Sequence, residues 1–278
     1  MKVKQRKTQK KHIPRCLVWT MGAVILVFVF CAIFARWVAP YDPTAMDFAA
    51  LMSGPSLAHP FGCDLLGRDV LSRIIYGAQT VLLTAVAAVA LGGAAGSLLG
   101  LCAGYLGGVI DAAVMRFTEA VLSIPMLVLA MSIGMALDQS RANLMIALAF
   151  SSMPSYIRIV RGQVRSIRNG AFVEAARIIG CTRRRIVLSH ILPNCLSPII
   201  VTATANMGSA ILAEASLSYL GVGIPSEIPA WGSMVSEGFA YLDLSPSLSV
   251  IPGAAIMITV LAFSILGDWL QDRLNIKS

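Results

Sequence analysis

Apolar stretches long enough to cross a membrane recur along this chain, separated by short polar segments. Six stretches lack Asp, Glu, Lys and Arg: 17–35, 74–110, 120–137, 142–157, 186–213 and 244–267. A transmembrane helix needs about 20 apolar residues to cross about 30 Å of hydrocarbon at 1.5 Å per residue. The pattern predicts an all-α membrane protein with six spans, at about 17–38, 79–105, 115–137, 142–160, 197–221 and 247–267. The first stretch is longer than the apolar part of a signal peptide, so we expect it to be retained as a span.

The basic residues are concentrated at two places, and their positions predict the topology. Seven Lys or Arg lie within the first fifteen residues, and eight Arg lie within 158–185. Cytoplasmic loops are enriched in Lys and Arg, and a cytoplasmic N-terminus places eighteen of the 22 basic residues inside. We therefore expect both termini to be cytoplasmic. Neither cluster is interleaved with aromatic residues, so the net charge of +8 does not indicate nucleic-acid binding.

These assignments divide the chain into consecutive segments. Residues 1–16 form a basic cytoplasmic N-terminus, 17–38 the first transmembrane helix and 39–78 an extracytoplasmic loop. Residues 79–267 hold the other five transmembrane helices and a cytoplasmic segment at 168–193, and 268–278 form a cytoplasmic tail. The 74–110 stretch would be roughly 55 Å long as a helix, so we expect its first residues, 74–79, at the outer interface.

Small residues recur every four positions within the second span, at Ala88, Gly92, Gly96, Gly100 and Gly104. On a helix these residues share one face, and glycine there lets another helix backbone approach closely. The ladder is typical of a tightly packed bundle. Two interpretations remain open, a helix beside a translocation path and ordinary packing between helices.

The chain lacks the motifs that carry covalent chemistry. None of its lysines belongs to a GxxxxGK[ST] phosphate-binding loop, so any ATP that drives it is expected to be hydrolysed by another protein. No GxSxG or HExxH motif is present, and the six cysteines form no CxxC pair. We therefore predict no catalytic residue, no metal ligand and no cofactor.

The segment between the fourth and fifth spans predicts two short cytoplasmic helices. Residues 171–179 form a helical stretch that ends at Gly180, the usual position of a terminating glycine. Its apolar face follows the i, i+3, i+4, i+7 spacing at Phe172, Ala175, Ala176 and Ile179. Thr182 is expected to cap a second helix that runs to about 191 and ends at Pro193. An exposed apolar face with basic neighbours suits either a groove on a partner protein or an anionic lipid surface.

Motifs within this segment resemble a known family. Glu174-Ala175-Ala176 with Gly180, followed by residues 190–194 (HILPN), is similar to the EAA signature of ABC importer permeases. Further stretches resemble the dipeptide/oligopeptide/nickel permeases of that class: 40–43 (PYDP), 59–73 (HPFGCDLLGRDVLSR), 217–223 (LSYLGVG), 231–234 (WGSM) and 266–272 (LGDWLQD). The chain departs from the pattern of this family at Cys63, Ser264 and Asn275, so these positions do not identify a subfamily.

The resemblance implies the permease subunit of a type I ABC importer, a multi-pass protein of the bacterial inner membrane. It also implies a homologous second permease subunit, two ATPase subunits and an extracytoplasmic solute-binding protein as partners. The residues it places in ATPase coupling are Phe172, Glu174, Ala175, Ala176, Ile179 and Gly180. Di- or oligopeptides are the expected cargo, with nickel, a metal chelate, glutathione or an opine-like solute as alternatives. A secondary transporter is the alternative from another class.

Glu214 is an acidic residue within the fifth span, where a charge is costly enough to suggest a role. We expect it either to line the translocation path, together with Asn206, or to bind a neighbouring helix through Asn206 or Ser218. The sequence does not decide between these roles.

Overall fold

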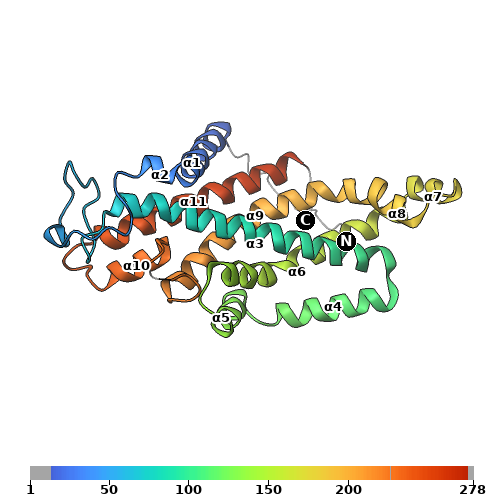
Figure 1. Ribbon diagram of the computed structural model, residues 1–278. Coiled ribbons are helices and arrows are strands. Elements are labelled where there is room, and N and C mark those ends of the chain that lie inside the picture. Colours follow the sequence, from blue (N-terminus) through green and yellow to red (C-terminus); the bar gives the residue numbers. More distant parts are fainter. Residues whose placement is uncertain (1–13, 226, 275–278) are drawn as a thin grey trace, which may run out of the picture.

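The computed structural model describes residues 14–225 and 227–274, and the regular elements in these ranges are all helices. In chain order they are α1 (Arg15–Ile33), α2 (Ala35–Val38), the 3₁₀ turn η1 (Phe48–Ala50), α3 (Val70–Leu106), α4 (Gly108–Leu122), α5 (Met126–Ala136), α6 (Arg141–Ile167), α7 (Ala171–Ile178), α8 (Arg183–Ile186), the π turn η2 (Val187–Ile191), α9 (Leu192–Tyr219), α10 (Trp231–Phe239) and α11 (Ser247–Arg273). The helices α3, α6, α9 and α11 form an elongated bundle (Figure 1). At one end lie α7 and α8, and at the other lie α10 and the segment 39–69 (Figure 1).

The all-α architecture is confirmed, with one predicted span divided in two. Five helical segments are long and apolar enough to cross a membrane, and α4 with α5 makes a sixth if this pair, bent by 90°, counts as one span. The break lies at 123–125, because Pro125 has no N–H to donate and disfavours a helical conformation at the residue before it. The span predicted at 115–137 therefore corresponds to parts of two helices, α4 and α5, on either side of this break.

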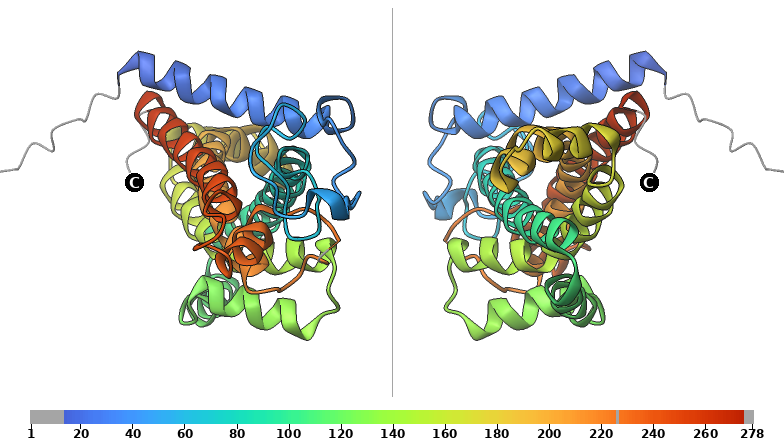
Figure 2. Two further views of the ribbon diagram at one scale, coloured as in Figure 1. Left: turned by 90° about the vertical axis from the view of Figure 1, so that its left-hand side faces the viewer. Right: turned by 90° about the vertical axis from the view of Figure 1, so that its right-hand side faces the viewer.

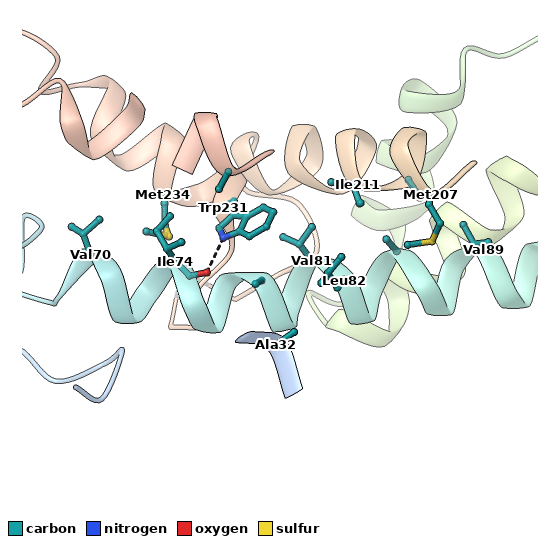
Figure 3. Packing of buried hydrophobic residues seen from close by; sticks show 14 of the residues in the cluster. Ala32, Val70, Ile74, Val81, Leu82, Val89, Met207, Ile211, Trp231 and Met234 are labelled. Atoms are coloured by element: carbon teal, nitrogen blue, oxygen red, sulfur yellow. Dashed lines mark hydrogen bonds between the residues drawn. The ribbon is translucent and has the colours of Figure 1, made fainter. Parts of the chain in front are cut away.

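Helix α3 has 37 residues and anchors the main apolar core. It begins after Asp69, whose carboxylate accepts a hydrogen bond from the Ser72 N–H at 2.7 Å, as an N-cap does. Residues 74–79 continue this helix. The indole of Trp231, which is fully buried, donates to the Ile74 carbonyl at 3.0 Å (Figure 3). Apolar side chains of α3, α9 and α10 surround this contact (Figure 3), so these helices are held together at the end of the bundle where α10 lies.

The ladder of small residues on α3 packs against α6. A Cβ at Gly92 would lie 2.6 Å from the Ala149 carbonyl oxygen, and one at Gly100 would lie 2.8 Å from the Ile157 carbonyl oxygen. Only glycine lets the two backbones approach this closely. Packing within this subunit therefore accounts for the ladder.

Helix α1 lies across the outside of the bundle, against α3 and α11 (Figure 2). Several of its large apolar side chains are exposed, among them Trp19, Leu26 and Phe30. An apolar helix exposed in this way suits lipid or the surface of another membrane subunit.

Candidate functional site

Helix α7 forms where the sequence predicts the first of two short helices. Helix α7 follows Gly170 and ends at Ile178, with Ile179 as its C-cap, and Gly180 then adopts φ +84°. The Gly180 N–H donates to the Arg177 carbonyl, and the Cys181 N–H donates to the Ala176 carbonyl, both at 3.0 Å. This pair of bonds is a Schellman motif, which requires a left-handed residue after the helix. Gly180 therefore sets the angle at which the chain leaves α7.

The structure divides the predicted apolar face of α7 between two sides. Ala176 is buried with Val173 in a cluster that includes Val164 of α6 and Ile186 of α8. Ala175 and Phe172 are exposed, and Ile179 is 81% exposed. The inward residues tie α7 to the bundle, while the outward residues stay available to a partner.

The sequence prediction did not include two residues that belong to the inward and outward faces of α7. Val173 is fully buried, and its i, i+3 spacing to Ala176 was the signal for the inward face. Ile178, at the end of α7, is 82% exposed beside Ile179. The Glu174 carboxylate is also exposed and forms no ion pair within residues 14–225 and 227–274.

The second short helix does not end at Pro193, so that prediction is wrong. Thr182 caps α8 as expected, accepting from the Arg185 N–H at 3.4 Å. The chain then continues through the π turn into α9, with Pro193 at the start of α9. A π turn uses i→i+5 hydrogen bonds, and here the Leu192 N–H donates to the Val187 carbonyl. This change in the hydrogen-bond pattern accommodates Pro193, which lacks an N–H. Because α8, the π turn and α9 are continuous, the segment that holds α7 and α8 joins the bundle without a break.

An open groove of about 560 Å³ lies between the C-terminal half of α6 and the N-terminal half of α9. Its polar lining residues are Ser155, Arg158, Gln163, Ser166, Thr202 and Asn206, with Gln271 from α11. The Asn206 amide donates to the Ser155 hydroxyl at 3.1 Å, which joins the two walls. Arg158 is exposed and forms no ion pair in the described part of the chain. Polar groups at membrane depth face protein or water, so we expect this groove to face another part of the importer or water rather than lipid.

Glu214 lies outside this groove, and the structure does not bring it together with Asn206. Its side chain is 0% exposed. One carboxylate oxygen accepts from the Ser218 hydroxyl at 2.8 Å, while the other has no partner among the described residues. Asn206 is eight residues away on the same helix, roughly 12 Å along its axis. Of the two candidate path residues, Asn206 lines this groove and Glu214 does not.

The opposite end of the bundle is held by a buried ion-pair cluster. Arg68 binds Asp64 at 2.6 Å and Glu237 of α10 at 2.9 Å, and Arg73 binds Glu237 at 3.3 Å. Burial raises the pKa of the neighbouring Cys63 thiol. These contacts connect the 39–69 segment to α3 and α10. No group of three or more His, Cys, Asp or Glu suited to a metal occurs within the described ranges.

Two family models match the chain. The binding-protein-dependent transport system inner membrane component matches residues 96–277, and the N-terminal TM domain of oligopeptide transport permease C matches residues 17–60. The probable D,D-dipeptide transport system permease protein of Escherichia coli K12 is 40% identical over 259 residues, covering 93% of this chain and 87% of that protein. The glutathione transport system permease protein of Escherichia coli O6:K15:H31 is 41% identical over 273 residues, covering 98% of this chain and 89% of that protein.

Solved structures share the fold. An inward-facing structure of the MetNI methionine ABC transporter matches with a TM-score of 0.59 and 18% identity, covering 73% of this chain and 96% of that chain. An amino acid ABC transporter with histidines matches with a TM-score of 0.55 and 19% identity, covering 73% and 94% of the two chains.

Proposed function

Because the chain belongs to the family of binding-protein-dependent transport system inner membrane components, it is the permease subunit of an ABC importer, and we propose that it translocates short peptides or peptide-like solutes. It is the membrane component of the importer rather than its ATPase, since its relatives are transport permeases. Permeases of this kind work with ATPase subunits and a solute-binding protein.

The peptide assignment rests on the two relatives that match nearly the whole chain. One is named for D,D-dipeptides and the other for glutathione, which are small peptides that carry carboxylates and amides. The α6–α9 groove suits such a solute, because amide and hydroxyl groups line it and Arg158 is unpaired there. Nickel and opine-like cargo have no support from these two relatives.

The coupling segment is proposed to dock into the ATPase. Exposed apolar residues on α7 suit a hydrophobic groove on a partner, and Phe172, Ile178 and Ile179 supply them. Gly180 positions α7 relative to α8, and the continuity of α8 with α9 would carry ATPase movement to the wall of the groove that holds Asn206. In this scheme the exposed Glu174 and Ala175 face the ATPase, whereas the buried Ala176 supports α7 from within.

The complete importer is proposed to contain this chain, a homologous permease, two ATPase subunits and an extracytoplasmic binding protein. We place the chain in the bacterial inner membrane with both termini cytoplasmic, on the basis of its distribution of Lys and Arg. In that orientation α7 and α8 face the ATPases, and α10 with the 39–69 segment faces the binding protein.

Uptake by reconstituted complex tests the substrate assignment. The chain is purified with its partner subunits, inserted into liposomes that contain ATP, and supplied with its binding protein and labelled dipeptide or glutathione. We expect ATP-dependent accumulation of at least one peptide, and none with a non-hydrolysable ATP analogue. Accumulation of a nickel complex but of no peptide would overturn the peptide assignment and leave the permease function intact.

A further inference from the structure

A polar pocket at the cytoplasmic end of the bundle lies apart from the α6–α9 groove. It has a volume of about 460 Å³ and lies between the end of α3 and the coupling helices. Tyr105 and Leu106 line it from α3, Arg177 and Cys181 from α7 and the following turn, and Arg183 and Ile186 from α8. The pocket therefore joins a bundle helix to the coupling segment.

The charge of this pocket is uncompensated. Arg177 and Arg183 are exposed and form no ion pair within residues 14–225 and 227–274, and no acidic residue lines the pocket. The arginines of α6 nearby differ, because Arg161 and Arg165 bind Asp111 and Arg168 donates to the Gly104 carbonyl. Two guanidinium groups without a partner make the pocket suited to an anion with several oxygen atoms.

One exposed apolar residue lines the pocket, and two more follow it along the chain. Leu106 lines the pocket and is half exposed, and the next turn carries Ile110 and Val109, which is 85% exposed. Leu106 belongs to α3 of the bundle, and Val109 and Ile110 belong to α4, so none of the three lies in the coupling segment. Basic groups next to an apolar strip at the inner end of membrane helices match a phospholipid, with its phosphate in the pocket and its acyl chain along the helices.

We propose that this pocket binds the phosphate of an anionic phospholipid from the cytoplasmic leaflet. Arg177 and Arg183 hold the phosphate, and Leu106, Val109 and Ile110 contact the acyl chain. The bound lipid joins α3 to the coupling segment, so the lipid composition of the inner leaflet influences how well ATPase movement reaches the bundle. An acidic segment of the ATPase is the competing occupant, but it would leave the apolar strip without a contact.

Lipid titration of the assembled complex tests this site. The complex with its ATPases is held in neutral detergent, phosphatidylglycerol is added, and bound lipid is counted by native mass spectrometry. Replacing both arginines, R177Q with R183Q, should weaken binding roughly 30-fold, about 2 kcal/mol at about 1 kcal/mol for each arginine. R177K with R183K should retain most of the binding, and R184Q, which changes a neighbouring exposed arginine outside the pocket, should leave it unchanged.

Several results would overturn the proposal. Wild-type affinity in R177Q/R183Q, or equal loss in R184Q, would show that the pocket does not select the lipid. Equal binding of phosphatidylcholine, or displacement of the lipid by an equal concentration of inorganic phosphate, would contradict an anionic lipid as the ligand. Lipid binding by the chain alone that disappears when the ATPases are added would assign the pocket to the ATPase. None of these results depends on which solute is transported.

Discussion

Gly96 of α3 lies so close to Tyr156 of α6 that a Cβ at Gly96 would be 2.8 Å from the Cβ of Tyr156. The same Cβ would be 2.6 Å from the Met153 carbonyl oxygen. Backbone atoms cannot move aside as the end of a flexible side chain can, so this contact determines how closely α3 and α6 approach. The position tolerates no side chain without separating the two helices.

Gly96→Ala should therefore destabilise the subunit by about 1–3 kcal/mol, the usual cost of overpacking. The matched control is Gly253→Ala in α11, where a Cβ would meet nothing within 4 Å. Alanine there should be neutral or stabilising by up to about 1 kcal/mol, because it is the better helix former. Thermal unfolding of the purified complex measures both. Equal midpoints for the two variants would contradict the close α3–α6 contact.

The ladder of small residues on α3 illustrates which features the sequence predicts well. A spacing of four residues identifies one helix face from the chain alone, and long uncharged stretches identify membrane helices, because both depend only on local periodicity and length. The end of α7 before Gly180 was also predicted, because a glycine after a helical stretch is a local signal.

Other features depended on contacts that a local pattern does not contain. Pro125 divides a stretch whose hydropathy is continuous, and Pro193 does not end a helix because a π turn accommodates it. The inward face of α7 is decided by the side chains of α6 and α8 that cover Val173 and Ala176. The site of Glu214 was equally undecided, since burial against other helices is a tertiary property.

Asn206 and Glu214 should respond differently to substitution, although both lie on α9. Asn206→Leu removes a polar group that lines the groove, so uptake per assembled complex should fall while assembly is retained. Glu214→Gln keeps an acceptor for Ser218 but introduces a buried N–H donor without a partner, which costs about 1–3 kcal/mol. The yield and unfolding temperature of that variant should fall, while uptake per complex stays at the wild-type rate. Reduced uptake by a fully stable Glu214→Gln complex would instead place Glu214 on the path.

Cysteine labelling tests the membrane orientation predicted from the basic residues. In a cysteine-free variant, a cysteine at Leu244, which is well exposed between α10 and α11, should react with an impermeant maleimide in intact cells. A cysteine at Ile178 of α7 should react only after the membrane is permeabilised. The opposite pattern would reverse the topology and move the coupling segment to the outside.

Substitutions on the two sides of α7 separate support from docking. Ile179 is 81% exposed, so Ile179→Asp should leave the stability of the chain unchanged while it weakens ATPase pull-down and uptake. Ala176 is buried against the bundle, and Ala176→Asp should cost roughly 3–5 kcal/mol by burying an unpaired charge. That variant should lose stability before the ATPase is added.

Gly180→Val, at φ +84°, should cost on the order of 1–2 kcal/mol and reduce ATPase association through a changed helix angle. Thermal unfolding of the chain, pull-down and uptake should be measured on each variant. Normal ATPase binding and uptake in Ile179→Asp would contradict docking through the exposed face, because α7 would then serve only to hold the bundle together.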